Sequence, residues 1–346
     1  MYIWNYCLIP SLMRNRTFIV AELSANHNQD FELAVKSIEA ISKTGVDAVK
    51  LQTFKPDSFT MDVNNGYFGP RKNGLWKGMR PIELYTRGAM PYDWQPRLMK
   101  IANDLGLVCF SSPFDYEAVD FMEEMGMPIY KVASLEITDT ILIRYIARKQ
   151  KPVMISTGAA SAEDIELALK ICRDEGNDRI TLLKCTSEYP APIEKANLLT
   201  LPDMRQRFGV EVGVSDHSMT NTIPLVSVAL GATVVEKHFI LDRSLGGIDS
   251  AFSLNPAEFS RLVEEIREVE KALGEVSYEL KEEDRLRRRS LFISKDIKAG
   301  EILTTDHVKS VRPGYGLHPK YLPEILGKKV NKNLKRGMRI NMEDIL

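Results

Sequence analysis

Cysteine is scarce in this chain of 346 residues, and no two cysteines are spaced as a CxxC pair. The four are Cys7, Cys109, Cys172 and Cys185. Such wide spacing is not that of the disulfide framework of a small secreted domain. Cys109 and Cys185 fall inside apolar runs, where we expect buried thiols. The cysteines therefore indicate a reducing, cytoplasmic setting.

Net charge is nearly absent as well, since 46 Lys and Arg residues balance 47 Asp and Glu residues to give −1. No global field favours nucleic acid or an anionic membrane as a partner, and we predict neither. The apolar stretch in MYIWNYCLIPSLMRNR is too short to cross a bilayer, and no charged region precedes it as in a signal peptide. We interpret residues 1–16 as a leader or start-site extension, with a membrane-touching tail as the alternative.

From Thr17 onward, short β-branched apolar runs alternate with longer segments of helical period, which is typical of a parallel α/β fold. The predicted strands are 18–23, 48–52, 107–111, 129–133, 153–156, 180–185, 210–214 and 233–238. The predicted helices are 31–43, 92–104, 115–125, 138–149, 162–175, 223–230 and 256–273. Eight strand–helix units in about 255 residues favour a (β/α)8 barrel. A doubly wound open sheet is the alternative, but it usually has fewer strands, and no glycine-rich phosphate loop follows the first strand here.

The segment 54–91 interrupts this alternation. It is rich in Gly, Asn and Lys, and Tyr67, Phe68, Trp76 and Tyr85 are interspersed in it. Long connections in compact domains are usually lids or binding loops, so we predict a lid. The alternative is a surface insertion without a role in function.

The composition of the sequence changes again near its C-terminus. We expect the barrel to cover residues 17–275 and a highly charged linker to cover 276–288, with its arginine run a solvated face. Residues 289–346 combine short strand runs with the turn signals KAGE and RPGYG, which predicts a small, mostly β module. A module of about sixty residues is marginal alone, so we expect it to pack on a barrel, its own or a partner's.

Polar side chains gather where the predicted strands end, which is where (β/α)8 barrels place functional residues. They are Glu22, Lys50, Gln52, Ser111, Ser112, Lys131, Ser134, Glu136, Ser156, Thr157, Lys184, Thr186, Ser215, His217, Glu236 and His238. Buried lysines are costly without a partner, so the set implies a bound anion. A phosphate and a carboxylate would suit Lys50, Lys131, Ser112, Ser134, Ser156 and Ser215. Each lysine could instead pair with a glutamate, reach solvent or form a Schiff base.

Two histidines, His217 and His238, end two successive strands about one strand–helix unit apart. A pair placed this way predicts an open divalent metal site completed by water and substrate oxygen, for which Mn²⁺ or Mg²⁺ suits better than a closed structural Zn²⁺. Asp216 could be a further ligand or support one, and two satisfied core histidines are the alternative. Glu22 could position or deprotonate a hydroxyl, and Asp249 either faces the mouth or fixes a turn.

At these residues the chain resembles the sialic acid synthase family, whose members condense phosphoenolpyruvate with a hexosamine aldehyde to make nine-carbon nonulosonic acids. The matching stretches are AELSANHNQD, VKLQTF, FSSPFD, YKVASLE, ISTGAAS, LLKCTSEYPAP, VGVSDHS, EKHF and RPGYG. The resemblance implies a (β/α)8 TIM barrel followed by a small C-terminal antifreeze-like (SAF) domain. It also implies a homodimer in which the SAF domain of one chain covers the active site of the other.

The same resemblance implies roles for individual residues. The metal, most suitably Mn²⁺ with Mg²⁺ or Co²⁺ as alternatives, would be bound by His217 and His238. Phosphoenolpyruvate would be bound by Lys50, Ser112, Lys131, Ser134, Ser156 and Ser215. The sugar would contact Glu22, Gln52, Glu136, Tyr189 and Asp249, and its acylamino group would contact Arg312 of the tail. In two departures, Ser187 and Ser112 stand where neuraminate-type members often have asparagine and threonine, which bears on sugar contacts and phosphate geometry.

Within the family, AELSANH, ELYTRGAMPYDW and RPGYGLHPKYLPEILGKK most resemble the pseudaminic acid branch. The acceptor would then be 2,4-diacetamido-2,4,6-trideoxy-L-altrose, whose 6-deoxy methyl suits an apolar lid. An N-acetylmannosamine-type sugar, for neuraminate or legionaminate, is the alternative. Two other classes of function stay open: a Schiff-base aldolase acting through Lys131 or Lys184, and a sugar- or ice-binding module built around the tail.

Overall fold

The structure, a computed structural model, describes residues 16–346. Apart from Arg16, the predicted leader 1–16 lies outside the described residues. The chain divides into two compact units after Gly274, and each is described here by itself. Within residues 16–346, no helix combines the length and the apolar character needed to cross a membrane.

The first unit is a closed barrel of eight parallel strands in sequence order, with β1 pairing with both β2 and β8. The strands are β1 (Phe18–Glu22), β2 (Ala48–Thr53), β3 (Val108–Pro113), β4 (Tyr130–Val132), β5 (Val153–Ser156), β6 (Ile180–Cys185), β7 (Glu211–Asp216) and β8 (Val234–His238). This confirms the predicted (β/α)8 barrel and all eight predicted strands. Strands of a parallel barrel are covered on both faces, and β1 is accordingly buried at all five of its residues.

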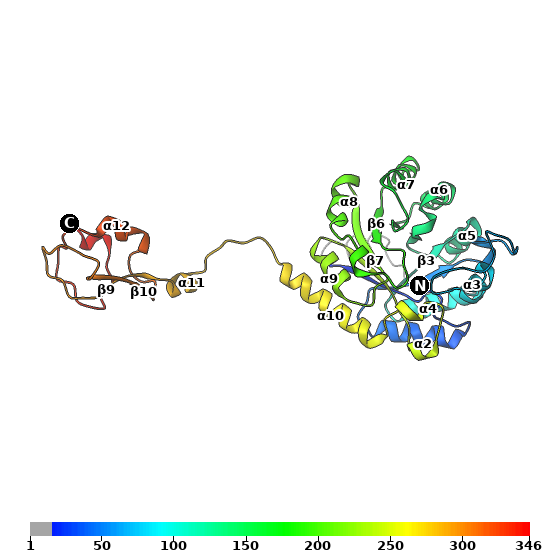
Figure 1. Ribbon diagram of the computed structural model, residues 1–346, viewed down its shortest axis with the longest axis horizontal. Helices are drawn as coiled ribbons and strands as arrows, with labels where there is room; N and C mark the ends of the chain where they lie inside the picture. Colours follow the sequence, from blue (N-terminus) through cyan, green and yellow to red (C-terminus); the bar gives the residue numbers. More distant parts are fainter. Residues whose placement is uncertain (1–15) are drawn as a thin grey trace. The chain divides into compact units, whose positions relative to one another are not determined.

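Helices lie around the outside of the barrel (Figure 1). They include α2 (Phe31–Ser42), α4 (Gln95–Asp104), α5 (Tyr116–Glu124), α6 (Thr140–Ala147), α7 (Ala162–Asp174), α8 (Thr200–Phe208), α9 (Thr222–Ala229) and α10 (Pro256–Leu273). Several begin at a residue whose side chain accepts a backbone N–H of the first turn, as Asp30, Asp115 and Asn255 do. The sequence analysis missed α8, because Pro202 masks a helical pattern. Proline is tolerated there because the first turn has no intrahelical acceptor for its N–H.

The segment between β2 and α4 is less irregular than we expected. It contains a short 3₁₀ turn, η1 (Pro56–Ser58), and a helix, α3 (Pro81–Gly88). Glu83 accepts the backbone N–H of Arg80 at 3.0 Å and so caps this helix, while Leu84 is buried against the barrel mouth. The segment therefore has a fixed element where the composition indicated only a loop.

The second unit contains one antiparallel pair of strands, β9 (Ser290–Ile293) and β10 (Val308–Val311). Two short helices accompany it, α11 (Glu282–Arg287) and α12 (Leu322–Ile325). The remaining pairing consists of isolated bridges, so the unit has less regular β structure than predicted. Its separate apolar core is formed by Leu291, Ile293, Ile297, Leu303, Val308, Ile325, Val330, Leu334 and Ile340.

Candidate active site

The carboxyl ends of the barrel strands open into a cavity of about 250 Å³. It is lined by thirteen of the fifteen predicted site residues, namely Glu22, Lys50, Gln52, Ser112, Lys131, Ser134, Glu136, Ser156, Tyr189, Ser215, His217, His238 and Asp249. The other two, Ser187 and Arg312, are not among its lining residues. Strand ends that are far apart in sequence therefore meet at one mouth, as expected for this fold.

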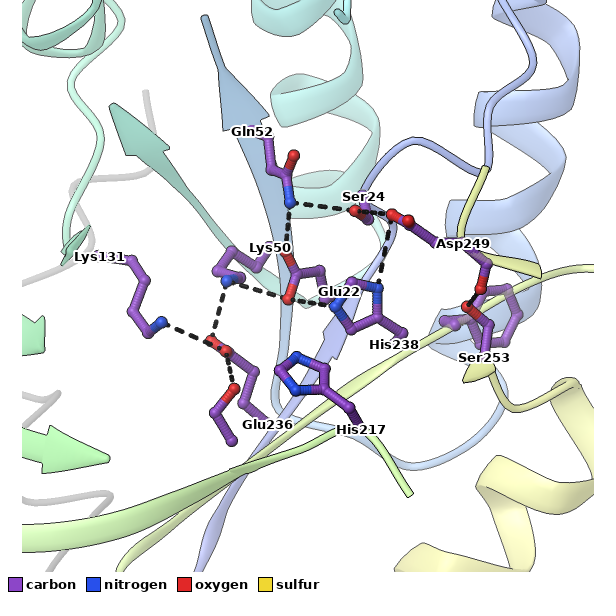
Figure 2. A network of polar contacts seen from close by, with 12 residues as sticks. Glu22, Ser24, Lys50, Gln52, Lys131, His217, Glu236, His238, Asp249 and Ser253 are labelled. Carbon is purple, nitrogen blue, oxygen red and sulfur yellow. Dashed lines mark hydrogen bonds and ion pairs between the residues drawn. The ribbon is translucent and has the colours of Figure 1, made fainter. Parts of the chain in front are cut away.

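Four buried charges form an alternating network at the bottom of the cavity, which we call the inner network: Glu22, Lys50, Lys131 and Glu236 (Figure 2). Lys50 Nζ lies 3.0 Å from Glu22 Oε2 and 3.2 Å from Glu236 Oε2. Lys131 Nζ lies 3.4 Å from Glu236 Oε1. Both lysines thus pair with glutamates of the same chain, the alternative left open above, so their burial alone does not require an external anion.

The two lysines are nevertheless not equally well paired. Burial lowers the pKa of Lys50, but Glu22 and Glu236 more than offset this, and its pKa is raised overall. Burial also lowers the pKa of Lys131, and here Glu236 and Glu22 offset the effect only in part. Glu22 and Glu236 keep lowered pKa values despite burial, because both lysines face them. Lys131 is therefore the member of the network that an added anion would stabilise most.

Two serine hydroxyls beside this network have no hydrogen-bond partner among the described residues. They are Ser112 Oγ and Ser156 Oγ, both buried. Ser215 Oγ, in contrast, donates to Glu236 Oε1 at 2.8 Å, and Ser134 Oγ accepts the backbone N–H of Gly158 at 3.2 Å. A buried polar group without a partner costs about 1–3 kcal/mol, so the two free hydroxyls indicate a ligand that hydrogen-bonds to them.

The two predicted histidines lie next to each other on the other side of Glu22, with their ring centroids 5.2 Å apart (Figure 2). His217 Nδ1 is 3.0 Å from the carbonyl oxygen of Thr186, so we assign its proton to Nδ1 and a lone pair to Nε2. His238 Nε2 is 3.3 Å from Glu22 Oε2, and its buried Nδ1 has no hydrogen bond. The pair keeps nitrogen lone pairs available at the cavity.

Two neighbouring imidazoles suit a divalent ion, and His217 and His238 would be its protein ligands, with Glu22 adjacent to His238. Among residues 16–346, no group of three or more His, Cys, Asp or Glu side chains is placed to hold a metal ion. A site with only two histidine ligands would need water or substrate oxygen to complete it. Asp216 is not part of it, because its carboxylate accepts Lys237 Nζ at 2.5 Å and the Ser218 N–H at 2.8 Å. Of the two roles expected for Asp216, these hydrogen bonds disfavour that of a metal ligand.

Polar residues above the histidines form a second hydrogen-bonded row. Gln52 Nε2 donates to Glu22 Oε1 at 2.8 Å and to Ser24 Oγ at 3.0 Å, and Ser24 in turn donates to Asp249 (Figure 2). The ring of Tyr189 lies 4.5 Å from that of His217. Burial raises the pKa of Glu136 to about 7, so this carboxyl is only partly ionised at neutral pH. Alternating donors and acceptors of this kind suit a polyhydroxylated substrate.

Some residues lie differently from the sequence-based expectation. Lys184 is not a lining residue, and its Nζ donates to the carbonyl of Cys185 at 3.0 Å, so a Schiff base there would not face the cavity. Ser187 does not line the cavity. Its Oγ lies 3.9 Å from Sγ of Cys185, which does line it. Arg312 is exposed in the second unit.

Other residues acquire a role that we did not assign to them. Glu236 joins the two lysines at the centre of the inner network, although only its place two residues before His238 hinted at this. Of the four interspersed aromatics in segment 54–91, Trp76 and Tyr85 line the cavity, whereas Tyr67 is 91% exposed. Arg71 lines it too, and no local sequence pattern marked that residue.

Comparisons with known proteins identify the family of the chain and its second module. The model of the NeuB family matches residues 37–278, and that of the SAF domain matches residues 288–346. The chain is 44% identical over 332 residues to a pseudaminic acid synthase of Campylobacter jejuni, covering 95% of this chain and 96% of that one. It is 36% identical to an N,N'-diacetyllegionaminic acid synthase of the same organism, covering 92% and 97%.

A solved structure is similar as well. It is the N-acetylneuraminic acid synthetase of Leptospira borgpetersenii in complex with citrate, with a TM-score of 0.70, 30% identity and coverage of 78% of this chain and 90% of that one. The family match spans well over half of the chain, and the SAF domain match confirms the predicted second module. The chain belongs to the NeuB family and is a nonulosonic acid synthase, an enzyme of the transferase type.

Proposed function

We propose that the enzyme condenses phosphoenolpyruvate with open-chain 2,4-diacetamido-2,4,6-trideoxy-L-altrose to give pseudaminic acid and phosphate. The observation that carries the proposal is that two free buried hydroxyls, Ser112 and Ser156, line the same cavity as Lys131 and the two histidines. An anionic donor and a carbonyl acceptor would thus meet in one cavity. The choice of sugar is supported by 44% identity to a pseudaminic acid synthase against 36% to a legionaminic acid synthase.

In this reaction, C3 of phosphoenolpyruvate forms a bond to the aldehyde carbon of the sugar. Water adds at C2, the bond from C2 to the phosphate oxygen breaks, and phosphate leaves. Lys50, Lys131 and the serine hydroxyls hold the phosphate and the carboxylate through charge and directed hydrogen bonds. Glu22 has a lowered pKa and is ionised at neutral pH, so its carboxylate would accept a hydrogen bond and orient a sugar hydroxyl.

The proposal includes a divalent ion held by His217 and His238, with Mn²⁺ preferred over Mg²⁺ or Co²⁺ for a site of imidazole and oxygen donors. When bound, such an ion supplies Lewis acidity toward the aldehyde. We expect a chelator to abolish phosphate release and Mn²⁺ to restore it. Calorimetry should show that His217→Ala no longer binds Mn²⁺. Full activity of His217→Ala in metal-free buffer would contradict this part of the proposal.

The substrate assignment is tested by measuring phosphate release from phosphoenolpyruvate with a panel of sugars. We expect turnover with the 2,4-diacetamido altrose derivative and much slower turnover with N-acetylmannosamine. The reverse preference would contradict the proposed substrate while leaving the synthase activity intact. A Schiff-base mechanism through Lys131 predicts trapping of substrate by borohydride, and we expect none.

We also propose a homodimer in which the SAF domain of each chain brings Arg312 to the sugar site of the other. Neither His217→Ala nor Arg312→Ala should be active alone at wild-type rates. Mixed and reassembled, the two variants would form one competent site, with the barrel of one chain and Arg312 of the other. Recovery of activity on mixing is the expected result, and no recovery despite dimer exchange would contradict the swap. Buried free thiols at Cys109 and Cys172 support a cytoplasmic location.

A further inference from the structure

We infer that Arg71 and Trp76, in the segment between β2 and α3, form a subsite for the second acylamino group of the sugar. This inference rests on the proposed function, because only a diacylated acceptor has a second such group. Arg312 is expected to contact one acylamino group. Arg71, which none of the sequence motifs includes, would recognise the other at the cavity mouth.

The guanidinium of Arg71 faces the cavity without a carboxylate partner. Its central carbon lies 5.4 Å from the centroid of the Trp76 ring, and Nη2 donates to Tyr85 Oη at 3.2 Å. Among the ion pairs of residues 16–346, none involves Arg71, whose side chain instead contacts Tyr85 and Trp76. The guanidinium of an arginine has five N–H donors, and the hydrogen bond to the Tyr85 hydroxyl uses only one of them. The remaining donors are available to a ligand in the cavity, which both Arg71 and Trp76 line.

The backbone holds these two side chains in place. Arg71 N–H donates to the Met79 carbonyl at 3.0 Å, and Gly78 N–H donates to the Arg71 carbonyl at 2.8 Å, which closes the turn that carries Trp76. Trp76 Nε1 then donates to the carbonyl of Ile248 at 3.1 Å. Ile248 lines the same cavity and precedes Asp249, which belongs to the polar row on the sugar side. The turn is therefore joined to the wall that contacts the acceptor.

The chemistry of this corner matches an acetamido group better than an anion or a hydroxyl. The anion side of the cavity is already provided by Lys50 and Lys131 at its bottom. At the mouth, a stacked guanidinium presents planar donors beside the apolar surfaces of Trp76 and Ile248. The carbonyl oxygen of an acetamido group would accept from the guanidinium of Arg71. Its methyl group would contact the apolar surfaces of Trp76 and Ile248. A hydroxyl would leave the apolar part of the corner without a contact.

The test is a thermodynamic cycle between the Arg71 side chain and the sugar. Wild type, Arg71→Met and the control Lys72→Met, an exposed neighbour that does not line the cavity, are assayed with the diacetamido sugar. The two analogues that carry a free amino group at C2 or at C4 are measured as competitive inhibitors of the same proteins. Melting temperature and the KM for phosphoenolpyruvate report whether each variant is correctly folded.

We expect Arg71→Met to raise the KM for the diacetamido sugar about 10- to 100-fold, as for a lost hydrogen bond from a charged donor, with the KM for phosphoenolpyruvate unchanged. The analogue that lacks the acetyl group recognised by Arg71 should bind wild type and Arg71→Met equally. Lys72→Met should behave as wild type. The inference is overturned if both analogues discriminate the variant as strongly as the full sugar does, or if Arg71→Met is kinetically normal. If wild type uses only monoacylated sugars, the proposed function itself fails, and the subsite fails with it.

Discussion

Two buried sets of charges lie at the same end of the barrel and behave oppositely. The inner network faces the cavity, whereas Lys237 and Asp216, which we call the outer pair, do not line it. Glu236 and Lys237 are consecutive in β8, so their side chains point to opposite sides of the strand. Lys237 is 0% exposed and Lys131 is 2% exposed, so burial does not separate the two sets.

Hydrogen bonding does separate them. In the outer pair, Asp216 accepts Lys237 Nζ and both the N–H and the hydroxyl of Ser218, and Lys237 also donates to the Ser218 carbonyl. In the cavity that the inner network faces, Ser112 and Ser156 keep free hydroxyls, and Lys131 is only partly compensated by its glutamates. Burial lowers the pKa of both Lys131 and Lys237, so a shifted pKa alone does not mark a site. Unsatisfied polar atoms that face a cavity do mark one.

The comparison predicts that replacing a lysine of the inner network lowers activity, whereas replacing the lysine of the outer pair lowers stability. Lys131→Met should lower kcat/KM by about 100- to 1,000-fold, because a desolvated charge that binds the substrate anion is lost. Its melting temperature should change little, since Glu236 keeps Lys50 as a partner. Steady-state kinetics and thermal unfolding check the two statements. A variant that unfolds but retains wild-type kcat/KM would place Lys131 with the outer pair.

Lys237→Met should instead destabilise the fold by about 3–5 kcal/mol, because it leaves Asp216 as an uncompensated buried charge. The folded fraction should keep a normal KM for phosphoenolpyruvate. Adding Asp216→Asn as a second substitution should recover part of the loss, as measured by urea unfolding. If the double variant is no more stable than Lys237→Met, the two residues do not act as a pair.

Glu136 differs from the glutamates of the inner network, because it lines the cavity and forms no salt bridge among the described residues. Its pKa is raised by burial to about 7, so its neutral form is favoured in the folded protein. The stability that Glu136 contributes is therefore present below its ordinary pKa near 4.5 and is lost as the pH rises through about 7. The ionised carboxylate of Glu136 would accept a hydrogen bond from the sugar, so sugar binding should become tighter as the pH rises through the same range.

We expect the KM for the sugar to fall about tenfold between pH 6 and pH 8, following the ionised fraction of a group with a pKa near 7. Glu136→Gln should remove this dependence, because an amide does not titrate. The KM for phosphoenolpyruvate serves as the internal control. A Glu136→Gln enzyme with the wild-type pH profile would assign the dependence to another group.

The sequence predicted the barrel well and the contents of its mouth only in part. Strand ends such as Lys50 and His238 were found because apolar runs mark where strands stop, and the fold brings those ends together. Pairing of Lys50 with a glutamate was an open alternative, but the identity of its partners was not predictable, since Glu22 and Glu236 lie on other strands and leave no local pattern. Arg71 lies in an irregular segment, where neither period nor strand position indicates which way a side chain points.

The central claim is that the free hydroxyls of Ser112 and Ser156, in the cavity of the inner network, receive phosphoenolpyruvate. Calorimetric titration of the double variant Ser112→Ala/Ser156→Ala tests this claim most directly. We predict an affinity for phosphoenolpyruvate at least about tenfold weaker than that of wild type, from the loss of two hydrogen bonds to a charged ligand. Without ligand, the melting temperature should be unchanged or higher, because two unsatisfied buried hydroxyls are removed. Wild-type affinity together with a lower melting temperature would contradict the claim.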